Sequence, residues 1–427
     1  MPPKIAAEPA AGRPPPAPPI LSTPAHPKSS GGQFIARLLS GFLLLVLTSA
    51  GVALLDDSGN WLLGRHFLSL LSGLLGTLAL LATLFVYLLM GLTPIIPKRI
   101  FLPVVAVMAL PFYAVLPVVI YHYDWLRWMD GILALCSGLV CCLSLRGLHG
   151  TWRLRWPLVR AAHLGARGFS GWNLLGFVLV NAFVVLPGSA AYLGLCAGAA
   201  MSHFTDGFVQ LRPAGIVLQA RKYTRADGRT VVLFPMSHIA ESDFYRSVAQ
   251  SVPSNAVVLM EGVSDTNQLL TTRLSYQRTA KSLHLAEQHA AFRIERGQLV
   301  RADVDVQNFS TSTIAMLNLV SQVYAEGLNQ HTLTQLLRYS PTDEGQAQLL
   351  DDLLVKRNQH VLGELQARLP GAGHFIIPWG AAHMAGLAQG LEQAGFHLVS
   401  TRDFVSIRFG GKPRSNGKTD WVPWKPD

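Results

Sequence analysis

Five long apolar runs in the first half of the chain constrain its fold more than any other feature of the sequence. Four of them are long enough to cross a bilayer, since a span needs roughly 20 apolar residues. These four lie at about 34–55, 66–92, 101–121 and 129–148. The fifth run, Trp172 to Met201, has Pro187 and Gly188 at its middle, which predicts either one kinked span or two short re-entrant halves. With 50% hydrophobic and only 14% charged residues, the composition indicates a protein that is embedded in a lipid bilayer.

The positions of Lys and Arg between these runs predict the orientation of the spans, because short cytoplasmic loops are rich in both. The densest basic loop follows the fourth run and contains Arg146, Arg153, Arg155, Arg160 and Arg167. This pattern predicts a multi-pass protein of the cell (inner) membrane with a cytoplasmic amino terminus. If the fifth run crosses once, everything after about residue 205 is extracytoplasmic or periplasmic, which we expect. If it crosses twice, that part is cytoplasmic.

The distribution of charge argues against two classes of function. The net charge is +10, and residues 1–204 contain 13 Lys and Arg against 5 Asp and Glu, whereas residues 205–427 contain 22 against 20. The basic excess therefore flanks the spans. The polar half has no basic cluster interleaved with aromatic residues, so nucleic acid is not expected as a partner. No ionisable residue lies deep in an apolar run, which disfavours a transporter and leaves a scaffold or channel as the weakest hypothesis.

Shifts in composition predict four segments. Residues 1–33 hold 10 of the 26 prolines and form a disordered Pro/Ala-rich tail that cannot bury a core. Residues 34–204 form a transmembrane domain with about five spans, and the length of the first run favours a retained anchor over a removed signal peptide. Residues 205–409 form a polar domain, and residues 410–427 form a flexible tail.

The polar domain alternates strand-like and helix-like segments. Two β-like runs, 216–223 and 229–234, flank an Asp-Gly pair, which is a hairpin signal. Short continuous apolar runs at 255–262 and 374–380 are typical of buried parallel strands. A long helix is expected at 343–369. The predicted fold class is thus a multi-span α-helical membrane domain followed by an α/β domain, a mixed sheet with helices on both faces.

Three of the predicted strand ends are followed by ionisable residues, namely His238, Glu261 and His383. Open α/β sheets bind ligands beyond the carboxyl ends of their strands, so these side chains are expected at one edge of one sheet. Two imidazoles and a carboxylate there are able to hold a divalent metal, or to act as base and acid around a bound carbonyl. The alternative is that each His only starts a helix and bonds the local backbone. Ser237 and Tyr245 lie within sequence reach of His238, without specific evidence for a role.

Arg357 lies within the apolar stripe of the helix expected at 343–369. A guanidinium on the core-facing side needs an acidic partner or a buried anion, since an unpaired buried charge is very costly. The acids available to it are Glu261, Asp303 and Asp305. Two roles stay open for Arg357: a structural salt bridge, or the binding of a carboxylate or oxyanion.

Asp303 and Asp305 belong to a segment, 300–306, that alternates apolar and polar residues like a strand edge. Alternation with period two places both carboxylates on one face of such a strand. The pair either assists a metal and positions a water, or forms a solvated strand face.

Five segments of the polar domain together resemble a known family. They read FPMSHIAESDFY, VVLMEG, VRADVDVQNFS, VKRNQHVLGEL and FIIPWGAAHMAGLAQGLEQAGFHLV, in that order. This set is similar to the TraB/PrgY/GumN family and its relatives, the TIKI proteases and the erythromycin esterase/ChaN-like group. The resemblance covers about residues 215–408, and the five apolar runs lie outside it.

The resemblance implies an α/β fold with two Gly-x-x-His motifs close to acidic and Arg residues. The second motif is intact from Gly380 to His383. The glutamate corresponds to Glu261, and the Arg-Asn pair corresponds to Arg357 and Asn358. The first motif departs from the family, because Pro235 stands where Gly is usual and proline has no backbone N–H.

TIKI members are metal-dependent peptidases, so the resemblance implies a membrane-anchored metallopeptidase-like hydrolase that acts on a peptide or protein outside the cytoplasm. A divalent metal of unspecified identity is expected with ligands among His238, His383, Glu261, Asp303 and Asp305. The expected catalytic residues are Glu261, Arg357, His238 and His383. The expected substrate-binding residues are Asn358, Gly380 and Ser237. The alternative is that the domain, like the pheromone-inhibitor branch of the family, sequesters a peptide signal without cleaving it. The sequence predicts no oligomeric state.

Overall fold

The computed structural model describes residues 30–410, except 154, 272–275, 328 and 339–342. The predicted tail at 410–427 and nearly all of the one at 1–33 lie outside these residues. The chain divides into two compact units. The first, the membrane unit, comprises Met1–Val115 and Trp125–Ala182, and the second, the α/β unit, comprises Leu116–Asp124 and Phe183–Asp427.

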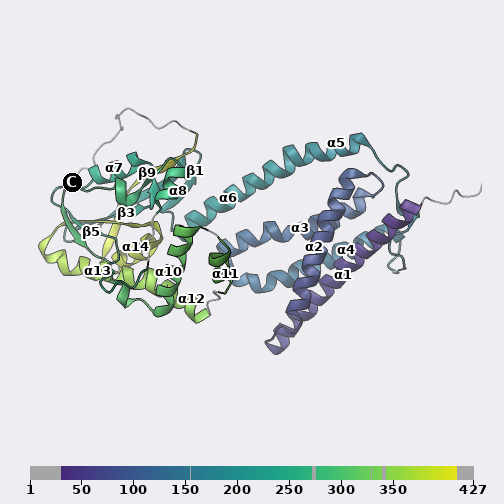
Figure 1. The fold of residues 1–427 in the computed structure, drawn as a ribbon, viewed down its shortest axis with the longest axis horizontal. Coiled ribbons are helices and arrows are strands. Elements are labelled where there is room, and N and C mark those ends of the chain that lie inside the picture. The colour runs from purple at the N-terminus through teal and green to yellow at the C-terminus, as the bar shows by residue number, and fades with distance from the viewer. Residues whose placement is uncertain (1–29, 154, 272–275, 328, 339–342, 411–427) are drawn as a thin grey trace, which may run out of the picture. The chain divides into compact units, whose positions relative to one another are not determined.

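The helices of the membrane unit follow the predicted apolar runs. They are α1 Ser30–Leu63, α2 Ser69–Leu92, α3 Lys98–Tyr121, α4 Leu126–His149 and α5 Gly171–Val180. Five helical stretches of the described chain are long and apolar enough to cross a membrane, and the last of them is Gly171–Phe204. The protein is therefore a membrane protein, as predicted (Figure 1).

The fifth apolar run forms one continuous helix rather than two re-entrant halves. Helix α5 passes through a π-helical segment, Asn181–Val185, into α6, Leu186–Phe204. The π segment immediately precedes Pro187, whose ring and missing N–H disturb the regular hydrogen-bond ladder of an α-helix. The irregularity near Pro187 is thus a π-helical segment within one continuous span.

All of α6 belongs to the α/β unit, whose second segment begins at Phe183. Met201 packs against the core cluster that contains Val209 and Leu218. Gly198 lies against Leu211 of β1, where an added Cβ would be 3.3 Å from the Leu211 Cβ. The last turns of the span are therefore part of the core of the domain that follows them.

The α/β unit contains a seven-stranded mixed sheet. Its strands are β1 Val209–Arg212, β2 Gly215–Arg225, β3 Thr230–Met236, β5 Val257–Met260, β7 Gln298–Arg301, β8 His374–Gly380 and β9 Phe396–Arg408. The order is β1-β2-β3-β8-β5-β7, with β9 also paired to β2. The pairs β3–β8, β8–β5 and β5–β7 are parallel, whereas β1, β3 and β9 each pair antiparallel with β2. A second sheet pairs β4 Ile239–Ala240 with β6 Ala286–Glu287.

Helices pack on both faces of the large sheet, as predicted. The remaining helices are α7 Ser242–Gln250, α8 Gln277–Ser282, α9 Gln288–Ala291, α10 Thr311–Glu326, α11 Gln330–Arg338, α12 Asp343–Leu350, α13 Lys356–Arg368 and α14 Met384–Gln393. Alternate residues of β3 enter different cores: Val231 and Leu233 pack with α13 and α14, whereas Val232 and Phe234 pack with α7. Figure 1 shows α7 and the pair α13 and α14 on opposite sides of the sheet.

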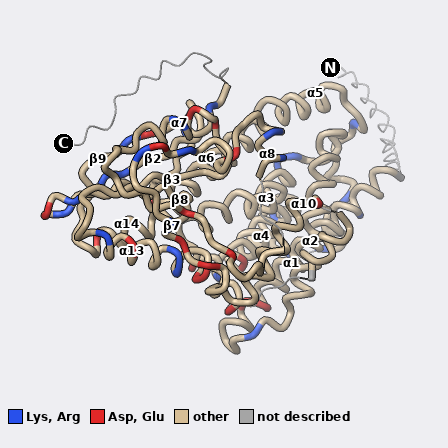
Figure 2. Tube along the Cα trace, turned by 60° about the vertical axis from the view of Figure 1, so that its left-hand side comes forward, with Lys and Arg blue, Asp and Glu red and all other residues tan. Residues whose placement is uncertain are grey.

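Two predicted elements differ in detail. The strand expected at 300–306 ends at Arg301, so Asp303 and Asp305 lie in the loop beyond it. The long helix expected at 343–369 is interrupted by a π-helical segment, Asp351–Val355, directly before α13. Figure 2 shows that the acidic residues, in red, lie mainly along the elements of the α/β unit.

Candidate functional site

Parallel pairing brings the predicted site residues to one edge of the large sheet. Met236 at the end of β3 is in register with Gly380 at the end of β8, and β5, which ends at Met260, pairs parallel with β8. His238, Glu261 and the Ala381–His383 turn therefore follow strand ends that meet at the same edge. This confirms the predicted placement of the three ionisable residues.

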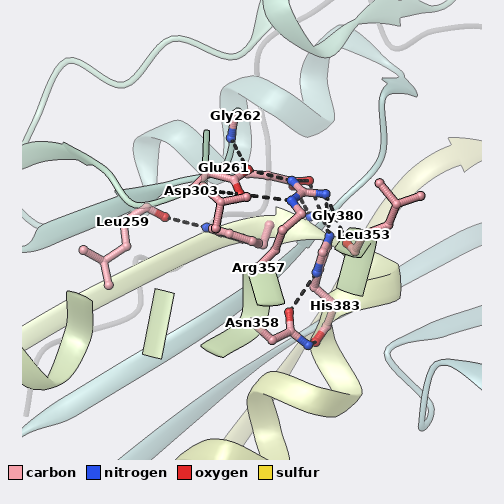
Figure 3. A network of polar contacts seen from close by, with 11 residues as sticks. Leu259, Glu261, Gly262, Asp303, Leu353, Arg357, Asn358, Gly380 and His383 are labelled. Carbon is pink, nitrogen blue, oxygen red and sulfur yellow. Dashed lines mark hydrogen bonds and ion pairs between the residues drawn. The ribbon is translucent and has the colours of Figure 1, made fainter. Parts of the chain in front are cut away.

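Arg357 of α13 lies at the centre of this edge, where it makes ion pairs with two acids (Figure 3). Its Nε donates to Asp303 Oδ1 at 3.0 Å, and its Nη2 donates to Asp303 Oδ2 at 2.6 Å. Nη2 also donates to Glu261 Oε1 at 2.9 Å. The side chains of Arg357 and Glu261 are each 13% exposed, and that of Asp303 is fully buried. The prediction that Arg357 pairs with nearby acids is confirmed for Glu261 and Asp303.

The guanidinium of Arg357 has a partner for each of its five N–H groups. Beyond the three bonds to acids, Nη1 donates to Leu353 O at 3.4 Å and to His383 Nε2 at 3.1 Å. Leu353 lies in the π-helical segment that precedes α13. Burial acts to lower the pKa of Arg357, but the bonds and charges of Asp303 and Glu261 outweigh it and raise this pKa. Arg357 is thus a fixed cation whose donors are used by its own chain.

His383 is buried and held in one orientation by two partners. Its Nδ1 is 2.8 Å from Asn358 Oδ1, and because an amide oxygen only accepts, Nδ1 carries the proton. Nε2 is then the acceptor of the bond from Arg357. Burial, and next the charge of Arg357, lower the pKa of His383 to about 4. The imidazole is therefore neutral at neutral pH, with its tautomer set by Asn358.

Glu261 is held through both carboxylate oxygens. Oε1 accepts from Arg357, and Oε2 accepts a short bond from the backbone N–H of Gly380. A Cβ at position 380 would lie 3.3 Å from Glu261 Oε2 and 3.6 Å from His383 Cδ2. Gly380 therefore lets the backbone approach the carboxylate closely. Its N–H serves Glu261 in this arrangement, whereas the resemblance implied a contact with substrate.

Asp303 and Asp305, predicted as a pair, lie in different environments. Asp303 accepts from the backbone N–H groups of Gly262 and Val304, each at 2.9 Å, in addition to its bonds from Arg357. Asp305 instead joins its loop to the one that follows β5, accepting from Ser264 Oγ at 2.8 Å and from Thr266 Oγ1 at 2.6 Å. Hydrogen bonds, first of all that from Thr266, lower the pKa of Asp305. We call Glu261, Asp303, Arg357, Asn358, Gly380 and His383 the sheet-edge cluster; Asp305 lies outside this bonded network.

His238 lies at the same edge but on its exposed side. Its ring is stacked on that of Tyr276, with centroids 4.9 Å apart and an angle of 6° between the planes. His238 follows the end of β3, which is in register with the end of β8, the strand before His383. Tyr276 is also close to Glu261, whose charge adds to the effect of burial in raising the pKa of the phenol. Sequence reasoning missed Tyr276, since a lone Tyr before a short helix carries no motif.

Ser237 and Pro235 have local roles in the structure. Ser237 Oγ donates to Ile239 O at 2.8 Å, and Tyr245 Oη donates to Ser237 O at 2.7 Å. Pro235 lies within β3, opposite Trp379 of β8 and beyond Leu233, where the pairing of β3 with β2 ends. The proline therefore occupies a strand position at which the missing N–H interrupts no pairing with β2.

The described residues contain no group of three or more His, Cys, Asp or Glu side chains placed to hold a metal ion. Arg357 gives the physical reason, because its N–H groups already bond Glu261, Asp303 and the Nε2 of His383. For these residues to hold an ion, the guanidinium would first have to leave. The arrangement as it stands does not fit a metal, and the metal stays a prediction.

Comparisons of this chain with family models, with curated proteins and with solved structures find no match. The resemblance to the TraB/PrgY/GumN family therefore rests on the residues quoted above and stays a prediction.

Proposed function

We propose that the protein is a membrane-anchored hydrolase that cleaves a peptide bond, or a similar amide or ester bond, at the sheet-edge cluster. The observation that carries the proposal is the arrangement of Glu261, Arg357 and His383. An acid, a guanidinium and a neutral imidazole lie within one bonded network at the edge where open α/β sheets bind ligands.

A purely structural role explains this network poorly. Removing charges from water is costly, and well-packed apolar residues of similar volume are often equally stable or more stable. A structural ion pair needs Arg357 and Asp303 alone. It does not need a second acid, an imidazole of fixed tautomer and a glycine that lets a backbone N–H reach Glu261. Perturbed groups that gather at a sheet edge are typical of acid-base machinery.

In this proposal Glu261 is the general base, since it is a carboxylate and its side chain remains partly accessible. Glu261 takes a proton from water as the water oxygen bonds the substrate carbonyl carbon. The C–N or C–O bond then breaks, and the leaving group receives a proton from Glu261 or from the exposed imidazole of His238. Arg357 fixes the position of Glu261, which replaces the oxyanion-binding role that the sequence left open for it.

The continuous helix Gly171–Phe204 supports a single crossing by the fifth run. With five crossings the amino terminus and the α/β unit lie on opposite sides of the membrane. The basic loops then place the amino terminus in the cytoplasm and the α/β unit in the periplasm or another extracytoplasmic space, on a cell (inner) membrane. A reporter fused after residue 205 that is active only in the cytoplasm tests this topology, and we expect it to be inactive.

The activity is tested with full-length protein in lipid nanodiscs and a peptide mixture that is analysed by mass spectrometry. Wild type is expected to produce fragments, and Glu261→Gln to lose this activity by roughly 10²-fold to 10⁴-fold, the usual contribution of a general base. Asp403→Asn is the matched control, because Asp403 is a carboxylate on β9 that pairs with Arg212 away from the cluster. Equal fragment yields from wild type and Glu261→Gln would refute the assignment of Glu261.

The same experiment separates cleavage from the alternative function, peptide sequestration. If the domain only captures a peptide, the intact peptide copurifies with wild type in stoichiometric amount and no fragments appear. That outcome would show that the protein is a peptide-binding module on a membrane anchor and not a hydrolase.

A further inference from the structure

Among the residues of the membrane unit that the structure describes, one end carries eight basic residues and no acidic residue. We call these residues the basic end: Arg37, Lys98, Arg99, Arg146, Arg153, Arg155, Arg160 and Arg167. No Asp or Glu occurs in residues 131–205, and the acids of the described membrane unit are Asp56, Asp57 and Asp130. These three belong to the later part of α1 and the start of α4, at the opposite end of the spans.

Hydrogen bonds gather the segments of the basic end, although they are far apart in the sequence. The backbone N–H of Val159 donates to Ser40 Oγ of α1 at 2.8 Å, one turn from Arg37. The N–H of Gly165 donates to Ile95 O at 2.8 Å, just before α3. Further bonds join the remaining helix ends: Ser144 Oγ donates to Ile100 O at 3.0 Å, and Asn173 Nδ2 donates to Gly91 O at 2.6 Å. The loop between α4 and α5 is thus bonded to α1 and to the α2–α3 connection.

The basic side chains of this end are all exposed. Within the part of the membrane unit that the structure describes, none of the eight forms an ion pair with an acid. Like charges at one end of the unit repel one another, and at physiological ionic strength this repulsion acts over about 8 Å. The arrangement therefore favours an anionic partner from outside the chain.

Exposed aromatic side chains accompany these charges. Trp152 is 60% exposed, Trp156 is 69% exposed and Trp172 is 84% exposed. The guanidinium of Arg146 lies over the Trp152 ring, with its Cζ 4.7 Å from the ring centroid. Trp is enriched where a span meets the lipid headgroups, because its ring is apolar and its N–H is polar. The aromatic residues place the basic end at headgroup depth.

We propose that the basic end is a binding site for the phosphate headgroups of anionic phospholipids. Arg binds phosphate well because its planar N–H groups match the phosphate oxygens. The backbone bonds from Val159 to Ser40 and from Gly165 to Ile95 hold the loop between α4 and α5 against α1 and the α2–α3 connection, so these segments are gathered before lipid binds. A soluble acidic protein would complement the basic charges, but it would not account for the exposed Trp residues that border the apolar spans. This inference is independent of any activity of the α/β unit.

Lipid selectivity is tested with purified full-length protein in a neutral detergent, where the orientation of the spans does not matter. Equal amounts of dioleoylphosphatidylglycerol and dioleoylphosphatidylcholine are added, and the retained lipid is identified by native mass spectrometry. We expect wild type to retain the anionic lipid at about tenfold excess, since each Lys or Arg near an anionic surface contributes favourably. The triple variant Arg153→Gln, Arg155→Gln, Arg160→Gln is expected to lose most of this preference.

A matched control removes the same number of charges elsewhere. Arg293, Arg296 and Arg301 are exposed arginines of the α/β unit, and their triple Gln variant is expected to keep the preference. Inorganic phosphate is then added in large excess as a competitor. A site for free phosphate would release the lipid under this competition, whereas a lipid site would keep it. Equal retention of both lipids by wild type, or an unchanged preference in the Arg153, Arg155 and Arg160 variant, would overturn the proposal. Displacement of the lipid by inorganic phosphate in large excess would do the same.

Discussion

Arginine is used in opposite ways in the two units of this protein. Arg357 is nearly buried in the α/β unit, and its five N–H groups bond two acids, an imidazole and a backbone carbonyl (Figure 3). The arginines of the basic end are exposed and lack acidic partners within the described membrane unit. The difference shows that a buried charge needs a partner within its own chain. A group of exposed like charges instead favours a partner from outside the chain.

The largest expected effect on stability follows from removing the buried cation. Arg357→Met keeps much of the side-chain volume but leaves Glu261 and Asp303 without their counter-ion. Breaking a buried pair in this way costs about 3–5 kcal/mol in the free energy of unfolding. Denaturant unfolding of full-length protein in detergent measures it, and a loss below about 1 kcal/mol, the range of surface pairs, would show that Arg357 is effectively solvated.

The second effect is a dependence of stability on pH. The pKa of His383 is about 4 in the folded protein and 6.5 in its ordinary state. Because the folded pKa is the lower one, the unfolded chain binds more protons between these values, and stability is full above pH 6.5 and lost as pH falls through 4. The loss is roughly 3 kcal/mol. His383→Gln cannot titrate, so subtracting its unfolding profile isolates this contribution; identical profiles would contradict a buried neutral imidazole.

A divalent cation provides a third test, because it competes with Arg357 for the same lone pairs. In Arg357→Met the ligand atoms of Glu261, Asp303 and His383 are released together. We therefore expect Mn²⁺ or Co²⁺ to stabilise this variant more than wild type, by about 2.7 kcal/mol at a cation concentration 100 times Kd. Thermal unfolding with and without the cation gives the answer. A larger stabilisation of wild type would show that the ion binds beside Arg357 rather than in its place.

A smaller effect is expected at Gly380. In Gly380→Ala the new Cβ would meet Glu261 Oε2 at 3.3 Å, so the carboxylate must move by a few tenths of an ångström. Overpacking of this kind costs about 1 kcal/mol or slightly more in unfolding free energy. The rate of hydrolysis should show the larger effect of the two, because Glu261 is displaced. Gly363→Ala is a suitable control, since no atom lies within 4 Å of a Cβ there. Equal activity of the two variants would show that the position of Glu261 is not critical.

The smallest effect on stability is expected at the basic end. The Arg153→Gln, Arg155→Gln, Arg160→Gln variant in detergent should unfold within about 0.5 kcal/mol of wild type, as surface substitutions usually do. Comparing it with Arg357→Met by the same denaturant titration tests the contrast between the units. A loss of several kcal/mol would reveal a structural partner for these arginines within the protein.

The parts of the fold that were predictable from sequence follow from the cost of burial. Apolar runs predicted the spans, and the core-facing position of Arg357 required an acid nearby, which the structure supplies in Glu261 and Asp303. The strand ends before His238, Glu261 and His383 lie at one edge because parallel strands have their carboxyl ends at the same edge of a sheet.

Other features depend on contacts that local patterns do not encode. Alternation at 300–306 predicted a strand, but the chain leaves the sheet after Arg301, and Asp305 accepts bonds from Ser264 and Thr266 of the loop after β5. The stacking of Tyr276 on His238 joins residues 38 positions apart, and neither carries a signal for the other. All five N–H groups of Arg357 have partners, and one of these partners is Leu353 O in the π-helical segment before α13. No pattern in residues 343–369 predicted this π-helical segment.

Cleavage of a peptide in H₂¹⁸O tests the central claim most directly. A hydrolase places one oxygen atom from water into the new carboxyl group of each product. We predict that full-length wild type in nanodiscs yields carboxyl termini labelled with ¹⁸O, and that Glu261→Gln yields none in the same time. Intact peptide from both proteins, or equal labelling by both, would contradict a hydrolytic role for the sheet-edge cluster.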